Sequence, residues 1–481
     1  AGGCSVGFGK VHADDAARAP GNAAVAIARI EESEAFAVRR HAAPNLLLLA
    51  GRGAPAPRRP AHQAPVGADV TADVAVDWWR QFGSAELDGF VGEALAANHD
   101  LGAALARIEQ ARAAAGITAA NRYPSLGVAA NTTRSHDSRD GGGADSTQLS
   151  ANVSYELDLW GGRRAEREAA AARLDSSIYD RDAAALVLQA EVAANYFQAL
   201  ALKDRLAIAR KNLDAARQLL GLVETRYEKG ANTGLEVAQQ RTSVLNIEAQ
   251  IPQLEQDLQA TQSALAILLG RAPQGFAVRG ETLDGLAIPA VAAFQPPQLL
   301  ERRPDIKRSE AQLAAAHADI GAARAALYPS VRLGASTVAG GVFSSGSSLV
   351  TSLIASLTQT LFDGGQLQGQ VRQSEARQAE LVQQYLQSVL VGMKEVQDNL
   401  VAVAASQSRQ GLLDQAAVQA REAYRIASVR YNAGSQDLLT LLDSQRTQLQ
   451  AEDSRIQAGL ARLNATVGLY KALGGGWASG A

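Results

Sequence analysis

At Arg430–Glu452 the chain reads RYNAGSQDLLTLLDSQRTQLQAE, and 204 residues earlier, at Arg226–Glu248, it reads RYEKGANTGLEVAQQRTSVLNIE. Each copy carries Arg-Tyr-x-x-Gly immediately before a new helical pattern. A glycine just past the last residue of a helix favours the left-handed backbone conformation that ends the helix. Each copy therefore predicts a hairpin of two helices, with Gly230 or Gly434 at its tip.

The duplication extends along most of the chain. Tyr123-Pro124-Ser125 recurs as Tyr328-Pro329-Ser330. Leu159-Trp160-Gly161-Gly162 recurs as Leu361-Phe362-Asp363-Gly364-Gly365. Because these separated landmarks keep their order at nearly one offset, the sequence predicts two copies of a unit of about 200 residues.

The composition argues against several classes of function. Lys plus Arg total 46 against 49 Asp plus Glu, so no net positive charge attracts nucleic acid. The single cysteine, Cys4, cannot form an internal disulfide. Histidines and acids show neither zinc-ligand spacing nor a catalytic constellation. We therefore expect no enzyme activity, no cofactor, no metal site and no nucleic-acid partner.

The N-terminal part predicts an irregular arm, residues 1–76, because it lacks any sustained helical or strand period. Ala1-Gly2-Gly3-Cys4 fits the end of a lipoprotein signal sequence, and the alternative is a stray thiol near a trimmed terminus. No stretch reaches the roughly 18 apolar residues of a membrane-spanning helix. Contact with a membrane would then come through strands or a lipid.

Each copy also predicts a β-hairpin, at 125–160 and at 330–362. Within Leu149–Leu159 apolar and polar residues alternate without a break. This matches the roughly 9 to 11 residues of a tilted membrane strand. A soluble hairpin with one wet face explains any single strand. Four such strands among long helices favour the wall of a barrel.

Four strands cannot close a barrel, so the chain is expected to form an oligomer. A dimer supplies eight strands, whose interior is filled by side chains. A trimer supplies twelve strands and leaves a lumen.

The remaining pattern is helical. Long helices are predicted at 163–226 and 365–430, each roughly 95 Å long at 1.5 Å per residue, and return helices at 235–269 and 437–473. Residues spaced by seven suggest coiled-coil seams: Leu206, Leu213 and Leu220, then Val389, Val396 and Val403. A coiled-coil scaffold is the alternative, and it leaves the alternating strands unexplained. The expected boundaries are a first repeat at 77–270, a connection at 271–308, a second repeat at 309–473 and a tail at 474–481.

Several motifs resemble the outer-membrane factor (TolC-like) family, in its lipoprotein branch. They are Trp78-Trp79, ERRPDIKRSEAQL at Glu301–Leu313, IGAARAALYPS at Ile320–Ser330 and the Leu-Trp-Gly-Gly and Phe-Asp-Gly-Gly pair. The resemblance covers about Asp77 to Leu473. It implies a mainly α fold with a membrane β-barrel, built as a homotrimer in which a twelve-strand barrel continues into a twelve-helix α-barrel.

The same resemblance implies the outer channel of a tripartite multidrug efflux pump. The partners would be a periplasmic adaptor, an inner-membrane pump of the resistance-nodulation-division type and outer-membrane lipid. A structural tether across the periplasm and a channel for protein secretion are the alternatives. The single methionine, Met393, gives no sign of a copper or silver relay.

The family's periplasmic gate maps onto the second tip. The resemblance implies that Asp443 forms an acidic ring, that Leu439 forms an apolar ring one turn earlier, and that Arg430 and Tyr431 hold the closed helices to their neighbours. Three carboxylates around one axis attract cations, and a leucine ring excludes water. Asp443 taken alone would be a solvated helix residue. Contacts with the adaptor are expected at Arg226, Tyr227, Gly230 and Gly434.

Two further assignments follow from the resemblance. The first tip has Gln239 where the second has Asp443, so the gate should differ between the repeats, and whether Asp204 is a further acidic partner stays open. Cys4 is followed by Ser-Val-Gly as in the family, which supports a palmitate-bearing lipid anchor and a location in the outer membrane reaching into the periplasm.

Overall fold

The computed structural model describes residues 76–136, 143–280, 282–289, 302–340 and 348–475. The chain comprises two units, Ala1–Asp69 and Val70–Ala481, and all described residues belong to the second. Cys4 and the predicted arm, except its last residue, therefore lie outside the described residues.

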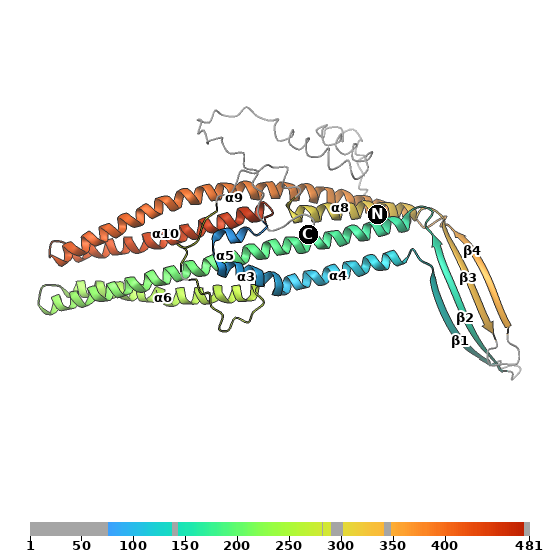
Figure 1. The fold of residues 1–481 in the computed structure, drawn as a ribbon, viewed down its shortest axis with the longest axis horizontal. Helices are drawn as coiled ribbons and strands as arrows, with labels where there is room; N and C mark the ends of the chain where they lie inside the picture. Colours follow the sequence, from blue (N-terminus) through green and yellow to red (C-terminus); the bar gives the residue numbers. More distant parts are fainter. Residues whose placement is uncertain (1–75, 137–142, 281, 290–301, 341–347, 476–481) are drawn as a thin grey trace, which may run out of the picture. The chain divides into compact units, whose positions relative to one another are not determined.

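The elements follow one order twice (Figure 1). The first copy contains α4 (His99–Ala120), β1 (Ser125–His136), β2 (Gly143–Leu157), α5 (Gly162–Glu228) and α6 (Gly234–Leu268). The second contains α8 (Pro304–Ala325), β3 (Ser330–Gly340), β4 (Ser348–Thr358), α9 (Gln366–Asn432) and α10 (Leu438–Ala472). A short 3-10 helix, η2 (Trp78–Phe82), and α3 (Ala85–Ala97) precede the first copy. The helix–hairpin–long helix–helix unit is thus present twice.

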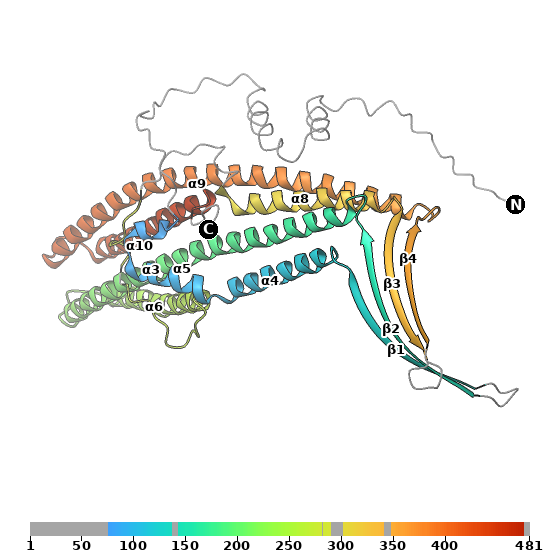
Figure 2. The ribbon, with the colours of Figure 1, turned by 45° about the vertical axis from the view of Figure 1, so that its right-hand side comes forward.

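The two long helices, α5 and α9, contain 67 residues each, which corresponds to about 100 Å. The return helices α6 and α10 contain 35 residues each and pack back along them (Figure 2). Leu206 and Leu213 are buried against α6, and Val396 is buried against α10. The seven-residue spacing therefore does mark the packed face of each long helix.

One expectation about membrane spans is wrong. Among the described residues, α5 is long enough and contains an 18-residue window apolar enough to cross a membrane. However, 67% of that window is buried inside the protein. The apolar residues of α5 therefore serve the protein core, and length and composition alone do not make this helix a membrane span.

Within the described residues the strands form one antiparallel sheet in the order β1-β2-β3-β4. The register places Val153 opposite both Leu126 and Ala335, and Ala335 opposite Leu353, so one apolar face crosses all four strands. Leu126 and Leu353 are 72% and 85% exposed. This face therefore has no cover from the rest of the described chain.

The strands end earlier than predicted, at Leu157 and Thr358 instead of 160 and 362. Past each strand, the next acidic residue instead accepts backbone N–H bonds at the start of the following long helix. Asp158 accepts backbone N–H bonds from Arg163 (3.1 Å) and Arg164 (2.8 Å). Asp363 accepts them from Gly365, Gln366 and Leu367.

The connection between the repeats is also shorter than predicted, because α8 begins at Pro304, inside the expected 271–308 segment. Proline suits the first turn of a helix, where its missing N–H and its fixed φ cost nothing. The long helices α5 and α9 and the return helices α6 and α10 begin and end within two residues of their predicted bounds.

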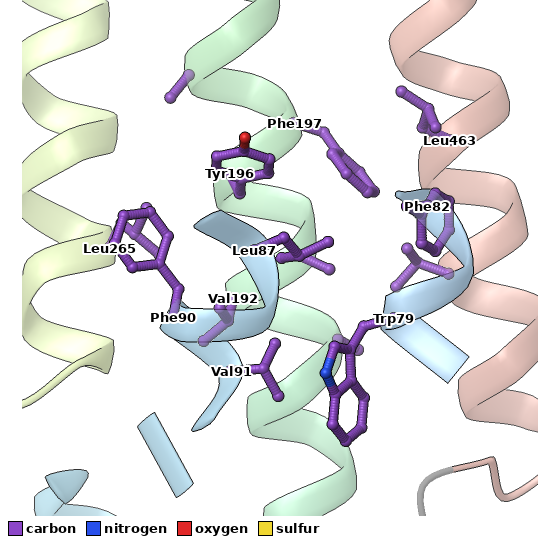
Figure 3. Close-up of a cluster of buried hydrophobic side chains, with 14 of the residues drawn as sticks. Trp79, Phe82, Leu87, Phe90, Val91, Val192, Tyr196, Phe197, Leu265 and Leu463 are labelled. Atoms are coloured by element: carbon purple, nitrogen blue, oxygen red, sulfur yellow. The ribbon is translucent and has the colours of Figure 1, made fainter. Parts of the chain in front are cut away.

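The main hydrophobic core lies where η2 and α3 pack on α5, between α6 and α10 (Figure 3). The Phe82 and Phe197 rings lie 5.0 Å apart between centroids, and the hydroxyls of Ser84 and Tyr196 lie 2.9 Å apart. Leu87 of α3 is fully buried in this core. This core joins the two repeats by packing α10 against the middle of α5.

Candidate functional site at the two helix tips

The two helix tips are the candidate functional site, because the residues expected to form the gate, Arg430, Tyr431, Leu439 and Asp443, belong to one of them. Tip 1, residues 226–239, joins α5 to α6, and tip 2, residues 430–443, joins α9 to α10. Tips 1 and 2 lie at the same end of their long helices, opposite the sheet (Figure 1).

Both tips have the same backbone turn. Gly230 and Gly434 have φ of 74° and 75°, a left-handed conformation that favours glycine. The N–H of Ala231 donates to the Arg226 carbonyl at 2.8 Å, and the N–H of Ser435 donates to the Arg430 carbonyl at 2.9 Å. These paired bonds satisfy carbonyls that the end of a helix leaves free.

The helices that leave the tips begin with different caps. Thr233 accepts the N–H of Glu236, whose carboxylate accepts the N–H of Thr233 at 2.6 Å, a reciprocal capping box. Asp437 caps α10 by accepting the N–H of Thr440 at 2.7 Å, and this bond lowers the pKa of its carboxyl. Both α6 and α10 thus begin at a fixed point directly after the turn.

Arg226 of tip 1 binds tip 2 of the same chain. Its guanidinium lies 4.7 Å from the centroid of the Tyr431 ring and donates to the carbonyls of Tyr431 (3.3 Å) and Asn432 (3.2 Å). The amide of Asn232 donates to the Tyr431 hydroxyl at 3.2 Å. Tyr431 is only 3% exposed, so it is the centre of a contact between the tips.

Apolar side chains from both tips complete this contact. One buried cluster contains Leu219 and Val223 of α5, Val237 of α6, Ala427 and Tyr431 of α9, and Leu438 and Leu441 of α10. The two tips of one chain are thus packed together, with Arg226 at the edge of the cluster.

The other expected gate residues point away from this cluster. Leu439 is 66% exposed, and Arg430 is exposed. The Asp443 carboxylate accepts from Arg446 of its own helix at 2.7 Å, and both side chains are largely exposed. Asp443 and Leu439 thus leave one acidic and one apolar group on the free surface of tip 2.

The expected adaptor-contact residues also divide into two groups. Tyr227 is 51% exposed, whereas Arg226 is used in the contact with tip 2. Gly230 and Gly434 lie exposed at the turns.

Asp204, considered as a further acidic partner, does not lie at a tip. It precedes Arg226 by 22 residues of continuous helix, which corresponds to about 33 Å. Its carboxylate accepts the N–H of Leu283 at 2.9 Å, and burial raises the pKa of its carboxyl. The ammonium of Lys203 donates to the carbonyl of Val278. Both side chains therefore hold the connection between the repeats against α5.

Two features of the tips were not predicted. The pairing of Arg226 with Tyr431 joins positions 205 apart, and only the repeated Arg-Tyr motif gave a hint of it. Arg446 pairs with Asp443 at the i,i+3 spacing, which the sequence displays. Among the residues the structure describes, no group of three or more His, Cys, Asp and Glu side chains is placed to hold a metal ion.

Comparison with known proteins identifies what the chain is similar to. A family model described as outer membrane efflux protein matches residues 90–271 and 295–475. The pyoverdine export outer membrane protein OpmQ of Pseudomonas aeruginosa is 39% identical over 90% of this chain and 96% of its own length. Two solved channels share the fold. OprN has a TM-score of 0.76 at 30% identity, covering 88% of this chain and 98% of that one. The open state of MtrE from Neisseria gonorrhoeae has a TM-score of 0.77 at 28% identity, with the same coverage.

Proposed function

The chain belongs to the outer membrane efflux protein family and has the predicted TolC-like fold of its channels, and we propose that it is the outer-membrane exit channel of a tripartite efflux pump. In this role it is a passive conduit, and a periplasmic adaptor and an inner-membrane pump, of the resistance-nodulation-division type, deliver the substrate. The observation that carries the proposal is a sheet with an uncovered apolar face joined to helices of about 100 Å.

The edges of the sheet support a homotrimer. Strands β1 and β4 are the outer strands of the sheet, and unpaired strand edges are not tolerated in lipid. Pairing β4 of one copy with β1 of the next removes both edges. Three copies supply twelve strands, which enclose a lumen, with the apolar face toward lipid and the face carrying Asn152, Ser154 and Ser336 toward the lumen.

The free surface of tip 2 supports a gate at the periplasmic end. In a trimer three Asp443 carboxylates and three Leu439 side chains would surround the axis one helical turn apart. Such rings attract cations and exclude water from a narrow constriction. We assign Arg430 and Tyr431 to the contacts that hold the closed tips together.

Outer-membrane leakage tests the gate. Cells that express the Asp443→Ala, Arg430→Ala double variant should become permeable to large hydrophilic antibiotics that the wild type excludes. The matched control is Gln239→Ala at the equivalent position of tip 1, which should leave the cells as tight as the wild type. Equal tightness of all three strains, at equal amounts of trimer in the membrane, would refute the gate assignment.

A second experiment separates the channel from the structural tether. Deleting the gene should raise the intracellular accumulation of dyes and antibiotics, and the wild-type gene should restore the original level. The tether predicts unchanged accumulation together with a loosened envelope. A channel for protein secretion predicts that exported proteins, and not dyes, are retained in the cell.

The class of substrate follows the pump more than the channel. Drugs and other small toxic molecules fit the proposed role, and similarity to the pyoverdine export protein OpmQ adds pyoverdine export as a second candidate. Measuring pyoverdine in the medium separates the two, because deletion of the gene would leave pyoverdine in the periplasm only if the channel exports it.

We also propose that Cys4 carries the lipid anchor. The support is the Cys4-Ser-Val-Gly sequence alone, because Cys4 lies outside the described residues. Labelling cells with radioactive palmitate should mark the wild type and not Cys4→Ser.

A further inference from the structure

One residue pair at the tips is present twice in the sequence but in contact only once within the chain. Arg226 stacks on Tyr431, and the equivalent residues in the other copy of the repeat are Arg430 and Tyr227. In the described part of this chain, the Arg430 side chain is exposed and makes no hydrogen bond, ion pair or ring contact. Tyr227 is 51% exposed, and in that part of the chain its hydroxyl makes no hydrogen bond and its ring makes no aromatic or cation–π contact.

We propose that Arg430 binds Tyr227 of a second copy of this chain, in the geometry that Arg226 and Tyr431 adopt within one copy. The proposal rests on the proposed trimer. The guanidinium of Arg430 would lie over the Tyr227 ring and donate to the carbonyls of Tyr227 and Glu228 of the next copy.

The duplication gives the reason. In the proposed trimer, tip 1 and tip 2 of each copy would alternate around one ring. A rotation by one tip moves tip 1 to the position of tip 2, and tip 2 to the position of tip 1 of the next copy. The same rotation turns the contact of Arg226 with Tyr431 within one copy into a contact of Arg430 with Tyr227 of the next copy. A contact of this head-to-tail type closes into a ring when the rotation does.

The surroundings of the two pairs match as well. The turns have the same left-handed glycine and the same pair of closing hydrogen bonds, so the backbone carbonyls are presented alike. Asn232 donates its amide to the Tyr431 hydroxyl, and the equivalent position in tip 2 is Gln436, which also has a primary amide. Gln436 would donate to the Tyr227 hydroxyl of the next copy.

The consequence is mechanical. An opening bordered by alternating tips widens only when neighbouring tips move apart. The Arg226 contacts tie the tips within each copy, and the Arg430 contacts would tie the copies to one another. Guanidinium–ring contacts of this kind depend on the planar arginine group, so lysine does not replace it.

Cross-linking tests the contact without reference to transport. With a short bis-maleimide, the variant Tyr227→Cys, Arg430→Cys should form covalent dimers and trimers on a denaturing gel. The matched variant Arg226→Cys, Tyr431→Cys should form only an internal link at monomer size, and the wild type, with Cys4 alone, gives the background. An internal link or no link in the first variant, while the matched variant reacts, would overturn the proposal.

A double-mutant cycle tests the consequence. Arg430→Ala and Tyr227→Ala should each raise antibiotic leakage, by the same factor, and the double variant should leak no more than either. Arg409→Ala, at another exposed arginine of α9, should leave leakage at the wild-type level. Additive effects would refute the pairing. The Asp443→Ala variant separates the two proposals. If it leaks while the cross-link fails or the two effects add, the channel proposal stands and only the contact of Arg430 with Tyr227 is refuted.

Discussion

Arg226 joins the two tips through a ring face and two backbone carbonyls at once, and arginine is the side chain whose planar group can do both. Tyr431 is buried beneath the Arg226 guanidinium, so this contact keeps water from the end of the buried cluster that both tips form. A single residue of tip 1 therefore limits how far tip 2 can move within its own chain.

We predict that Arg226→Ala loosens the tips by roughly 1 to 3 kcal/mol, since it removes a cation–π contact and two hydrogen bonds. Tyr431→Phe should have a smaller effect, because it keeps the ring and loses only the bond from Asn232. Hydrogen exchange measures both. Faster exchange at residues 220–240 and 425–445 supports the prediction, and exchange as slow as in the wild type contradicts it.

Asp204 predicts a pH dependence of stability. Burial raises the pKa of its carboxyl above the usual 3.8, so the folded state binds this proton more tightly than the unfolded state does. Its contribution to stability is therefore greatest below pH 3.8 and is lost as the pH rises through the folded-state value. Asp204→Asn keeps an acceptor for the Leu283 N–H and carries no charge to bury.

The Asp204→Asn protein should consequently be more stable than the wild type at pH 7, with the difference shrinking toward pH 4. Thermal unfolding of the purified protein at several pH values measures this. A variant that is less stable than the wild type at pH 7 would show that the charge itself holds the connection in place.

At the scale of the elements, the turn of each tip depends on one glycine. Gly434 has φ of 75° with open space around its α-carbon, so adding a methyl group meets a backbone penalty and no clash. Gly221 lies in an exposed, helical part of α5, also in open space. The two glycines therefore make a matched pair with opposite expectations.

We predict that Gly434→Ala destabilises tip 2 by about 1 to 2 kcal/mol, the cost of a left-handed conformation for a residue with a Cβ. Gly221→Ala should instead stabilise α5 by about 0.5 to 1 kcal/mol. Hydrogen exchange of α9 and α5 separates the two effects. Equal effects of the two substitutions would contradict the assigned role of the turn.

The elements were largely predictable from sequence, because the 3.6 and 2.0 periods and the tip glycines are local signals. The ends of the strands were not, since Asp158 continues the alternation while its carboxylate accepts N–H bonds from the first turn of α5. The apolar window of α5 is a local signal, but its burial is not, because its residues face a core that α3, α6 and α10 build from distant parts of the chain.

Across the whole unit Val70–Ala481, the contacts at the helix tips were less predictable from the sequence than the fold. The two tips have nearly the same sequence, so no local signal states which arginine contacts which tyrosine. The structure answers this for Arg226, whereas the side chains of Arg430 and Tyr227 form no such pair within the described chain. The two repeats share the pattern that forms the helices and strands. The proposed gate lies where they differ, at Asp443 of tip 2, whose equivalent in tip 1 is Gln239.

In the proposed channel, three copies of the chain surround one pore that the second tips close. Single-channel recording of the purified protein in planar bilayers checks this. The wild type should conduct little, and Asp443→Ala with Arg430→Ala should conduct more and lose its preference for cations. Currents of the double variant that match the wild type in size and selectivity would show that the second tips do not close the pore.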